Sequence, residues 1–306
     1  MSVLVCVTGR NNDKLMAKLS DAIPDVKIEQ WPHCEDLNRV QFVLAWNAPD
    51  DLWQQLPNLK VVQSYGAGVD GIALDKLKPC VSVARIVDQQ LSVDMAEYVL
   101  SHVLAHKLRH REYAANQNEG YWKPRRSLGG QEVGILGLGE LGKVTAEALV
   151  RHGFSVRGWS RSQKELPNVS CYAGEEQLET FLSEVDYLVC LLPLTQQTKG
   201  ILNAQLFSML PANCVVINVA RGQHLVEQDL LAALDNNELG GAVLDVFSTE
   251  PLPDNHPFWS HSKVTVTPHV AAVTNMDTVV AQIAANVHAC LDDTPLENQV
   301  NLSKGY

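Results

Sequence analysis

Residues 134–142 read GILGLGELG and contain the pattern GxGxxG. An apolar run over Glu132–Leu136 comes before the turn, and residues Lys143–His152 read as a helix. In such a strand–turn–helix unit, the first glycine permits the tight turn, the second lets backbone amides approach a pyrophosphate, and the third lets helix and strand pack closely. The N–H groups that begin the helix attract the anion. The turn residues expected at a dinucleotide cofactor are Gly137, Leu138, Gly139, Glu140, Leu141 and Gly142.

Short apolar runs alternate with helical stretches on both sides of this turn. That alternation is typical of a parallel sheet with helical crossovers. From the turn to the C-terminus, the runs predict a complete dinucleotide-binding sheet; they are Glu132–Leu136, Ser155–Trp159, Tyr187–Leu192, Cys214–Val219, Gly241–Val246 and Lys263–Thr267. Toward the N-terminus, the runs predict a second, smaller sheet; they are Val3–Val7, Val26–Glu29, Phe42–Trp46, Val61–Tyr65 and Val81–Ile86.

Two helical patterns set the predicted domain boundaries. A long pattern over about Val93–Asn116, with Ser92 as its N-cap, separates the two series of strands. A final pattern over about Asn275–Leu291 follows the sixth strand, and we expect this helix to return to the first domain. The predicted fold is α/β, with two doubly wound parallel-sheet domains: a flavodoxin-like substrate domain (1–92 and 274–306) and a Rossmann cofactor domain (93–273). Two chain crossings predict a cleft between the domains, a common place for a small-molecule site.

Composition limits the classes of partner. The chain has 306 residues, 46% of them hydrophobic and 19% charged, which is typical of a globular protein. Its net charge of -11 argues against nucleic acid and anionic membranes as partners. The seven cysteines form no CxxC pair and are expected to be reduced thiols. With no apolar run long enough for a bilayer and no signal-peptide pattern at the N-terminus, we expect a cytoplasmic protein.

The end of the second strand of the cofactor domain predicts which dinucleotide binds. NAD-binding sites usually carry Asp or Glu there, to accept from the ribose hydroxyls. This chain has Trp159, Ser160, Arg161 and Ser162, and no carboxylate until Glu165. A guanidinium pairs with a 2′-phosphate, which a carboxylate would repel. We therefore expect NADPH to be preferred and NADH to be possible; the alternative is that Arg161 is an ordinary surface residue.

Three more motifs follow strands of the cofactor domain: NVARG at 218–222, LDVF at 244–247 with Glu-Pro-Leu at 250–252, and TPHVA at 267–271. Strand ends line the ligand crevice in a doubly wound sheet. In this order and spacing, these motifs and the glycine turn resemble the D-2-hydroxyacid dehydrogenase family, and in particular the branch that reduces glyoxylate and hydroxypyruvate. Other supporting stretches are LAWNAPD (44–50), YGAGVD (65–70), WSR (159–161), residues 230–247 and the terminal Gly305-Tyr306.

The resemblance implies catalytic Arg221, Glu250 and His269. The chemistry of these residue types agrees with that assignment. A guanidinium can hold both the carboxylate and the carbonyl of a 2-oxo acid, and an imidazolium can protonate the carbonyl oxygen as hydride arrives. A carboxylate beside the imidazole favours its charged form. Taken singly, each residue has an ordinary alternative, such as a surface ion pair or a turn.

The resemblance also implies cofactor contacts for Pro193, Thr198, Val219 and Ala220. Asp245 is expected to accept from the nicotinamide carboxamide, or else only to cap the following turn. In the first domain, the amides of Ala67 and Gly68 are expected to bind the substrate carboxylate, unless the loop is an ordinary tight turn. Trp46 is expected to form a wall of the pocket or to serve only in packing.

Several features leave alternatives open. His102, His106 and His110 recur at helical spacing, which suggests either a metal site or, with more weight, a polar or interface face. A basic and aromatic stretch over 109–126 suggests an arm that reaches a partner subunit, because the family is commonly dimeric. A larger 2-hydroxyacid is the second candidate substrate. A nucleotide-sensing corepressor built on the same fold is the second candidate function.

Overall fold

The structure, a computed structural model, describes residues 1–302 and divides into two compact units. Unit 1 contains Met1–Gln89 and the chain from Thr274 onward, and unit 2 contains Gln90–Val273. Gly305 and Tyr306, which belong to the family resemblance, lie outside the described residues. Among the described residues, no helix combines the length and the apolar character that crossing a membrane requires.

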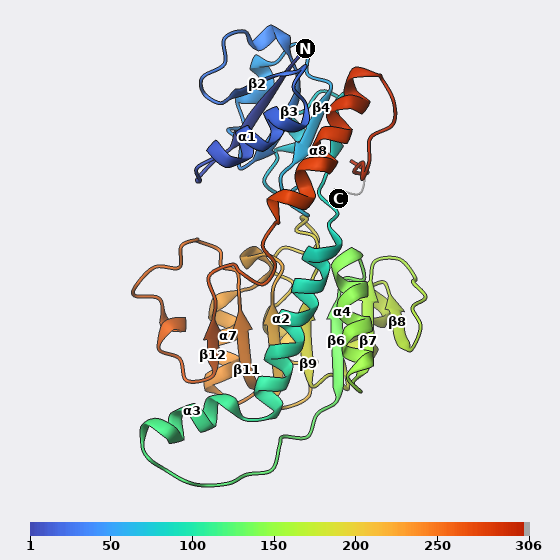
Figure 1. Cartoon of the computed structure of the whole chain (residues 1–306). Coiled ribbons are helices and arrows are strands. Elements are labelled where there is room, and N and C mark those ends of the chain that lie inside the picture. Colours follow the sequence, from blue (N-terminus) through green and yellow to red (C-terminus); the bar gives the residue numbers. More distant parts are fainter. Residues whose placement is uncertain (303–306) are drawn as a thin grey trace. The chain divides into compact units, whose positions relative to one another are not determined.

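Unit 1 is built on a parallel sheet of five strands in the order β2-β1-β3-β4-β5, as in flavodoxin-like folds. Its strands are β1 (Ser2–Val7), β2 (Lys27–Gln30), β3 (Val40–Trp46), β4 (Val61–Ser64) and β5 (Ser82–Ala84). Short 3-10 turns lie at Leu37–Arg39, Leu52–Gln55 and Leu74–Lys76. Helices α1 (Asp13–Ala22) and α8 (Met276–Leu291) pack side by side in this unit, as Figure 1 shows. Leu15, Leu19, Ile283 and Val287 join them to the apolar face of the sheet.

Unit 2 contains a parallel sheet of seven strands in the order β12-β11-β10-β9-β6-β7-β8. This is the Rossmann order with one strand added at the edge. The strands are β6 (Glu132–Leu136), β7 (Ser155–Ser160), β8 (Val169–Ala173), β9 (Tyr187–Cys190), β10 (Cys214–Asn218), β11 (Leu239–Leu244) and β12 (Val264–Val266). Since all pairs are parallel, the carboxyl ends of the strands lie along one edge of the sheet.

Helices cover both faces of this sheet. On one face, α2 (Gln89–Lys107) and α4 (Glu140–Arg151) share an apolar core with the strands, and Figure 1 shows α2 lying across them. The other face packs against α5 (Leu178–Leu182), α6 (Ala204–Phe207) and α7 (Glu227–Asp235). Helix α3 (His110–Asn118) and the chain after it extend from the end of unit 2. Short 3-10 turns lie at Glu175–Gln177, Gly222–His224 and Pro257–Trp259.

The expected fold class is confirmed, but the structure differs from the prediction in three details. Strand β8 was not expected, because it is short, lies at the sheet edge and keeps most of its side chains partly exposed, so no apolar run marks it. The long helix expected over 93–116 is two helices, since Arg109 takes a left-handed backbone conformation (φ 60°) and ends the first one. Ser92 is not an N-cap, because α2 begins at Gln89.

Candidate active site

The glycine turn joins β6 to α4 in the form that a pyrophosphate requires. Gly137 has a φ of +104°, and a Cβ there would lie 2.7 Å from the carbonyl oxygen of Leu191. A Cβ on Gly142 would lie 1.9 Å from the carbonyl oxygen of Gly137, so only glycine lets the helix pack this closely. Gly139 begins the helix with no side-chain cap, and a Cβ there would meet no atom within 4 Å. The turn is therefore tight where it packs on protein and open where backbone N–H groups would meet an anion.

Two of the expected cofactor residues face the core. Leu138 and Trp159 are both buried, and the indole of Trp159 donates to the carbonyl oxygen of Gly174 at 2.8 Å. The carbonyl oxygen of Trp159 accepts from the amide of Gly137 at 2.8 Å. This bond ties the end of β7 to the glycine turn. Any contact of Leu138 or Trp159 with a cofactor is therefore made by the backbone.

Ser160, Arg161 and Ser162 form the turn at the carboxyl end of β7. The Ser160 hydroxyl donates to the carbonyl oxygen of Ser162 at 2.8 Å, which closes the turn. Arg161 and Ser162 are exposed. Through Trp159, the strand end that carries Arg161 is bonded to Gly137. The structure therefore brings the guanidinium-bearing turn and the glycine turn to adjacent strand ends, as a 2′-phosphorylated dinucleotide needs.

The loops after β9 and β10 are joined by a histidine that the sequence analysis missed. The Thr198 hydroxyl donates to the carbonyl oxygen of Pro193 at 2.7 Å and so folds the loop after β9. His224 is fully buried, with Nε2 3.3 Å from the same Pro193 oxygen and Nδ1 3.2 Å from the backbone nitrogen of Arg221. Its only sequence signal was its position three residues after Arg221. Val219 and Ala220 belong to the loop after β10 and are largely buried.

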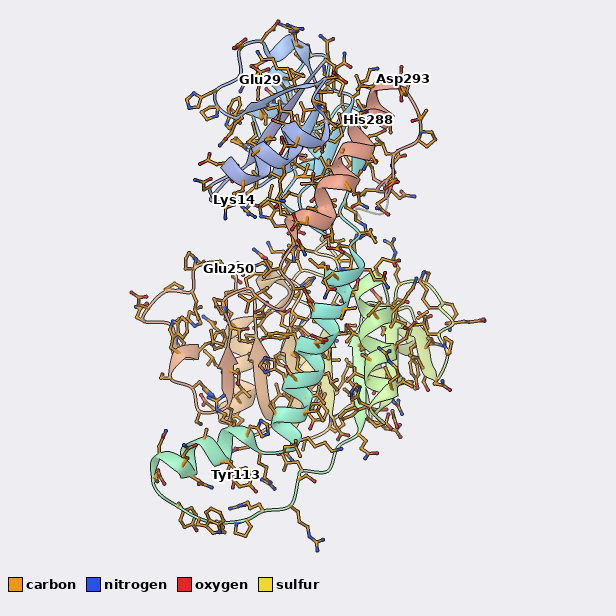
Figure 2. All side chains as sticks on the ribbon, viewed as in Figure 1. Lys14, Glu29, Tyr113, Glu250, His288 and Asp293 are labelled. Atoms are coloured by element: carbon orange, nitrogen blue, oxygen red, sulfur yellow. The ribbon has the colours of Figure 1, made fainter. Side chains whose placement is uncertain are left out.

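Arg221, Glu250 and His269 meet at the carboxyl ends of neighbouring strands. They follow β10, β11 and β12, which lie side by side in the sheet. The Nδ1 atom of His269 lies 2.8 Å from Oε2 of Glu250. The other carboxylate oxygen of Glu250 accepts from the backbone amide of Phe247 at 2.9 Å, which fixes the carboxylate. Glu250 is labelled in Figure 2, at the end of unit 2 opposite Tyr113 of α3.

The charges of these three residues act on one another. The hydrogen bond to Glu250 is the main influence on His269 and raises the pKa of its imidazole, against burial and the nearby charge of Arg221, which lower it. Burial raises the pKa of Glu250, but the bonds from His269 and Phe247 and the charge of Arg221 outweigh burial and hold that pKa below its ordinary value. Glu250 therefore favours the protonated form of the His269 imidazole, and His269 favours the ionised form of Glu250, beside the guanidinium of Arg221.

His269 is held in an unusual backbone conformation. Its φ of 53° is in the left-handed region, which is uncommon for a residue other than glycine. Its amide donates to the carbonyl oxygen of Asp245 at 2.8 Å. The Asp245 carboxylate accepts from the amides of Val270 and Ala271, each at 2.9 Å. Asp245 therefore caps the turn that carries His269, which is not the turn that follows Asp245 in the sequence.

Comparisons with known proteins show the family to which the chain belongs. The sequence model of the family described as "D-isomer specific 2-hydroxyacid dehydrogenase, NAD binding domain" matches residues 100–271. A relative named glyoxylate/hydroxypyruvate reductase A, from Yersinia enterocolitica, is 41% identical over 300 residues, which is 95% of each chain. The chain belongs to the D-isomer specific 2-hydroxyacid dehydrogenase family. The family resemblance seen in the motifs is thereby confirmed, as is the enzyme class, an NAD(P)-dependent 2-hydroxyacid dehydrogenase.

Two solved structures of this family are closely similar. A D-isomer specific 2-hydroxyacid dehydrogenase from Xanthobacter autotrophicus, in complex with NADPH and MES, is 37% identical with a TM-score of 0.93 and covers 100% of this chain and 99% of its own. An NADPH-dependent glyoxylate/hydroxypyruvate reductase from Sinorhizobium meliloti, in complex with NADP and sulfate, is 36% identical with a TM-score of 0.91 and covers 100% of both chains.

In unit 1 of the dehydrogenase, the loop after β4 directs its carbonyl groups inward. The carbonyl oxygens of Ala67 and Gly68 accept from Arg85 Nη1 at 3.4 Å and from the Ser64 hydroxyl at 2.6 Å. Within residues 1–302, the N–H groups of Ala67 and Gly68 have no acceptor. They are available for an anion. The partly buried ring of Trp46 packs so closely on Gly66 that a Cβ there would lie 2.6 Å from Cζ3 of the indole.

The three recurring histidines do not share one helix face. His102 lies against the ring of Tyr98, and His106 Nδ1 is 3.2 Å from the hydroxyl of Tyr187. His110 begins α3, beyond the left-handed Arg109. Among the described residues, no three His, Cys, Asp or Glu side chains form a group that could hold a metal ion.

Proposed function

We propose that this dehydrogenase uses NADPH to reduce small 2-oxo acids, glyoxylate to glycolate and hydroxypyruvate to glycerate. The observation that carries the proposal is the 2.8 Å pair of His269 and Glu250 beside Arg221, on the sheet that also carries the glycine turn. The names of the similar proteins, glyoxylate/hydroxypyruvate reductases from two other organisms, support the same substrate class.

Each catalytic residue has one proposed task. Arg221 binds the carboxylate of the 2-oxo acid and orients its carbonyl group. When bound, the reduced nicotinamide supplies the hydride. His269 donates a proton from Nε2 to the carbonyl oxygen, because its Nδ1 is engaged by Glu250. Glu250 keeps the imidazole charged before the transfer and oriented during it. The product is the 2-hydroxy acid, and His269 is left neutral.

The proposed cofactor residues surround the glycine turn. Gly139 to Gly142 would hold the pyrophosphate, and Arg161 with Ser160 and Ser162 would hold the 2′-phosphate. Further along, the loop residues Pro193, Thr198, Val219 and Ala220 would line the ribose and nicotinamide. The two similar solved structures contain NADPH and NADP, which supports the phosphorylated cofactor for this chain.

Replacing Arg161 tests the cofactor preference. A bidentate bond from a guanidinium to a phosphate is a strong, charge-assisted one, so Arg161→Ala should reduce the ratio of kcat/KM for NADPH to that for NADH by about 10- to 100-fold. Steady-state kinetics with each cofactor give this ratio. Lys164→Ala, which removes another exposed positive charge four residues from the end of β7, is the matched control and should change the ratio much less. An unchanged ratio in Arg161→Ala would mean that this arginine does not read the 2′-phosphate.

The substrate class is tested with a panel of 2-oxo acids. With NADPH in excess, we expect the highest kcat/KM for glyoxylate and hydroxypyruvate, with Trp46 and the amides of Ala67 and Gly68 selecting small acids. The second candidate is a larger 2-oxo acid. If a bulky acid gives the highest kcat/KM, the proposed substrate class is wrong while the enzyme class stands.

We also propose that the protein is a homodimer. Trp122 is 95% exposed and Tyr121 is 54% exposed, on the chain that follows α3. Two neighbouring basic side chains pair within this chain, since Glu112 accepts from both Arg109 and Arg125. An apolar ring left in solvent beside satisfied charges is what a partner subunit would cover. Sedimentation equilibrium tests the proposal, and a monomer mass at assay concentrations contradicts it.

A further inference from the structure

Behind the turn that carries His269, unit 2 holds a chain of polar groups to which the reaction scheme assigns no task. Asp245, at the end of β11, is 1% exposed. Its Oδ1 atom accepts from the hydroxyl of Thr267 at 2.5 Å, and the hydroxyl of Tyr98, on α2, lies 2.5 Å from the same Thr267 oxygen. These three residues come from segments far apart in the sequence.

The direction of each hydrogen bond follows from the chemistry of its groups. The Thr267 hydroxyl donates its one proton to the carboxyl oxygen Oδ1 of Asp245. The Thr267 oxygen must then accept, and Tyr98 is the donor. Burial raises the pKa of Tyr98 to about 12, so this phenol keeps its proton at neutral pH. The relay therefore runs from Tyr98 through Thr267 to Asp245.

The relay ends on the groups that hold the His269 turn. Besides Thr267, the Asp245 carboxylate binds the amides of Val270 and Ala271 at 2.9 Å, and its backbone oxygen binds the amide of His269 at 2.8 Å. A residue other than glycine, such as His269, keeps a left-handed backbone conformation only where several contacts hold it there. Ordering of the Asp245 carboxylate is one such constraint, because a carboxylate free to rotate would lose its alignment with both amides.

We propose that Tyr98 and Thr267 are positioning residues of this dehydrogenase, whose hydroxyls lock the Asp245 carboxylate and thereby hold the turn that presents His269. This inference rests on the proposed role of His269 as proton donor. The inference gives Tyr98 a role in the reaction, although Tyr98 lies in the middle of α2 and belongs to none of the motifs at the strand ends. Neither residue is a catalytic group, since each acts through Asp245.

Tyr98→Phe removes only the hydroxyl, because the ring stays packed against His102 with 4.4 Å between centroids. We expect kcat for glyoxylate reduction to fall about tenfold, as the loss of one hydrogen bond in a charged network would produce, with the Kd for NADPH unchanged. Thr267→Val, which breaks both links, should lower kcat further, and Thr267→Ser, which keeps the hydroxyl, should restore it. The double variant Tyr98→Phe with Thr267→Val should match Thr267→Val alone, because both changes break one relay.

Hydrogen exchange gives a readout that needs no substrate. In Tyr98→Phe, the amides of Val270 and Ala271 should exchange about tenfold faster by NMR, since their acceptor is less ordered. Tyr187→Phe is the matched control: it removes another buried phenol of unit 2, bonded to His106, and should leave both amides and kcat as in the wild type.

Three outcomes overturn the inference: Tyr98→Phe with wild-type kcat and exchange, Tyr187→Phe with the same losses, or Thr267→Ser as impaired as Thr267→Val. If the wild-type protein reduces no 2-oxo acid, the proposed function fails instead. In that case, the exchange of Val270 and Ala271 alone decides whether the relay holds the turn.

Discussion

The expected ligand residues of unit 2 and those of unit 1 are held together in different ways. In unit 2, Arg221, Glu250 and His269 come from three neighbouring strand ends, and the 2.8 Å contact with Glu250 and the charge of Arg221 both act on the pKa of His269. In unit 1, the indole of Trp46, at the end of β3, covers Gly66 in the turn after β4, and the carbonyl oxygen of Gly68 in that turn is bonded within the unit. No charged side chain of that turn is expected to act on the substrate.

This difference predicts that unit 2 carries out proton transfer and that unit 1 selects the substrate. Groups whose pKa values are shifted by a specific partner are suited to proton transfer. Backbone amides and an indole offer shape and a fixed dipole, which suit selection of a substrate. Changes in unit 2 should therefore alter kcat or its pH dependence, and changes in the unit 1 turn should alter KM.

The largest effect is expected from His269→Ala. Loss of the proton donor should lower kcat for glyoxylate reduction about a thousandfold, since general acid catalysis contributes on the order of 10²–10⁴. The Kd for NADPH, measured by fluorescence titration, should stay near that of the wild type, because the glycine turn is untouched.

His261→Ala provides the matched control for His269→Ala. His261 is also a histidine of unit 2 paired with a carboxylate, at 3.3 Å from Asp235, but it precedes β12 and so is not at the carboxyl ends of the strands. We expect this variant to keep the kcat of the wild type. Near-normal turnover in His269→Ala would mean that the imidazole is not the proton donor. The proposed difference between the two units would then be wrong.

The strand ends of unit 2 could be predicted because parallel strands bring distant motifs to one edge. Once the glycine turn fixed the sheet type, Arg221, Glu250 and His269 had to lie near one another, whatever their separation in sequence. The class of fold followed from the same runs. Unit 1 was predicted less sharply, because a single tryptophan or a glycine-rich loop has as many structural as functional uses.

The parts that could not be predicted depend on side-chain directions. Tyr98 lies inside a helix, 169 residues from Thr267, and no local pattern marks the contact between their hydroxyls. No sequence pattern distinguishes His224 from an ordinary loop residue, although it is buried and bonded to the loops after β9 and β10. The break at Arg109 depends on a single left-handed residue within a sequence that otherwise reads as helix.

A smaller effect, on pH dependence, is expected from Glu250→Gln. The bond to Glu250 is the main reason that the pKa of His269 is raised, so removing the negative charge should lower that pKa. In the proposed mechanism, reduction requires protonated His269 and is lost as pH rises through its pKa. The alkaline limb of kcat/KM should therefore move to lower pH, with the deficit of the variant growing as pH rises. Glu227→Gln, which removes the partner of His256, should leave the limb in place. If the alkaline limb does not move in Glu250→Gln, Glu250 does not set the pKa of His269 during the reaction.

The smallest effect is expected in unit 1, from Gly66→Ala. The added Cβ would lie 2.6 Å from Trp46, so the indole must shift, whereas no group of the acid–base pair is altered. We expect KM for glyoxylate to rise about two- to fivefold, in line with the loss of well-placed packing, while kcat stays constant. Gly129→Ala, which adds a Cβ with no atom within 4 Å, is the control for the substitution itself. A fall in kcat at constant KM would place unit 1 in the chemical step. Substrate selection in unit 1 and proton transfer in unit 2 would then not be separate tasks, even at Gly66, whose substitution alters no group of the acid–base pair.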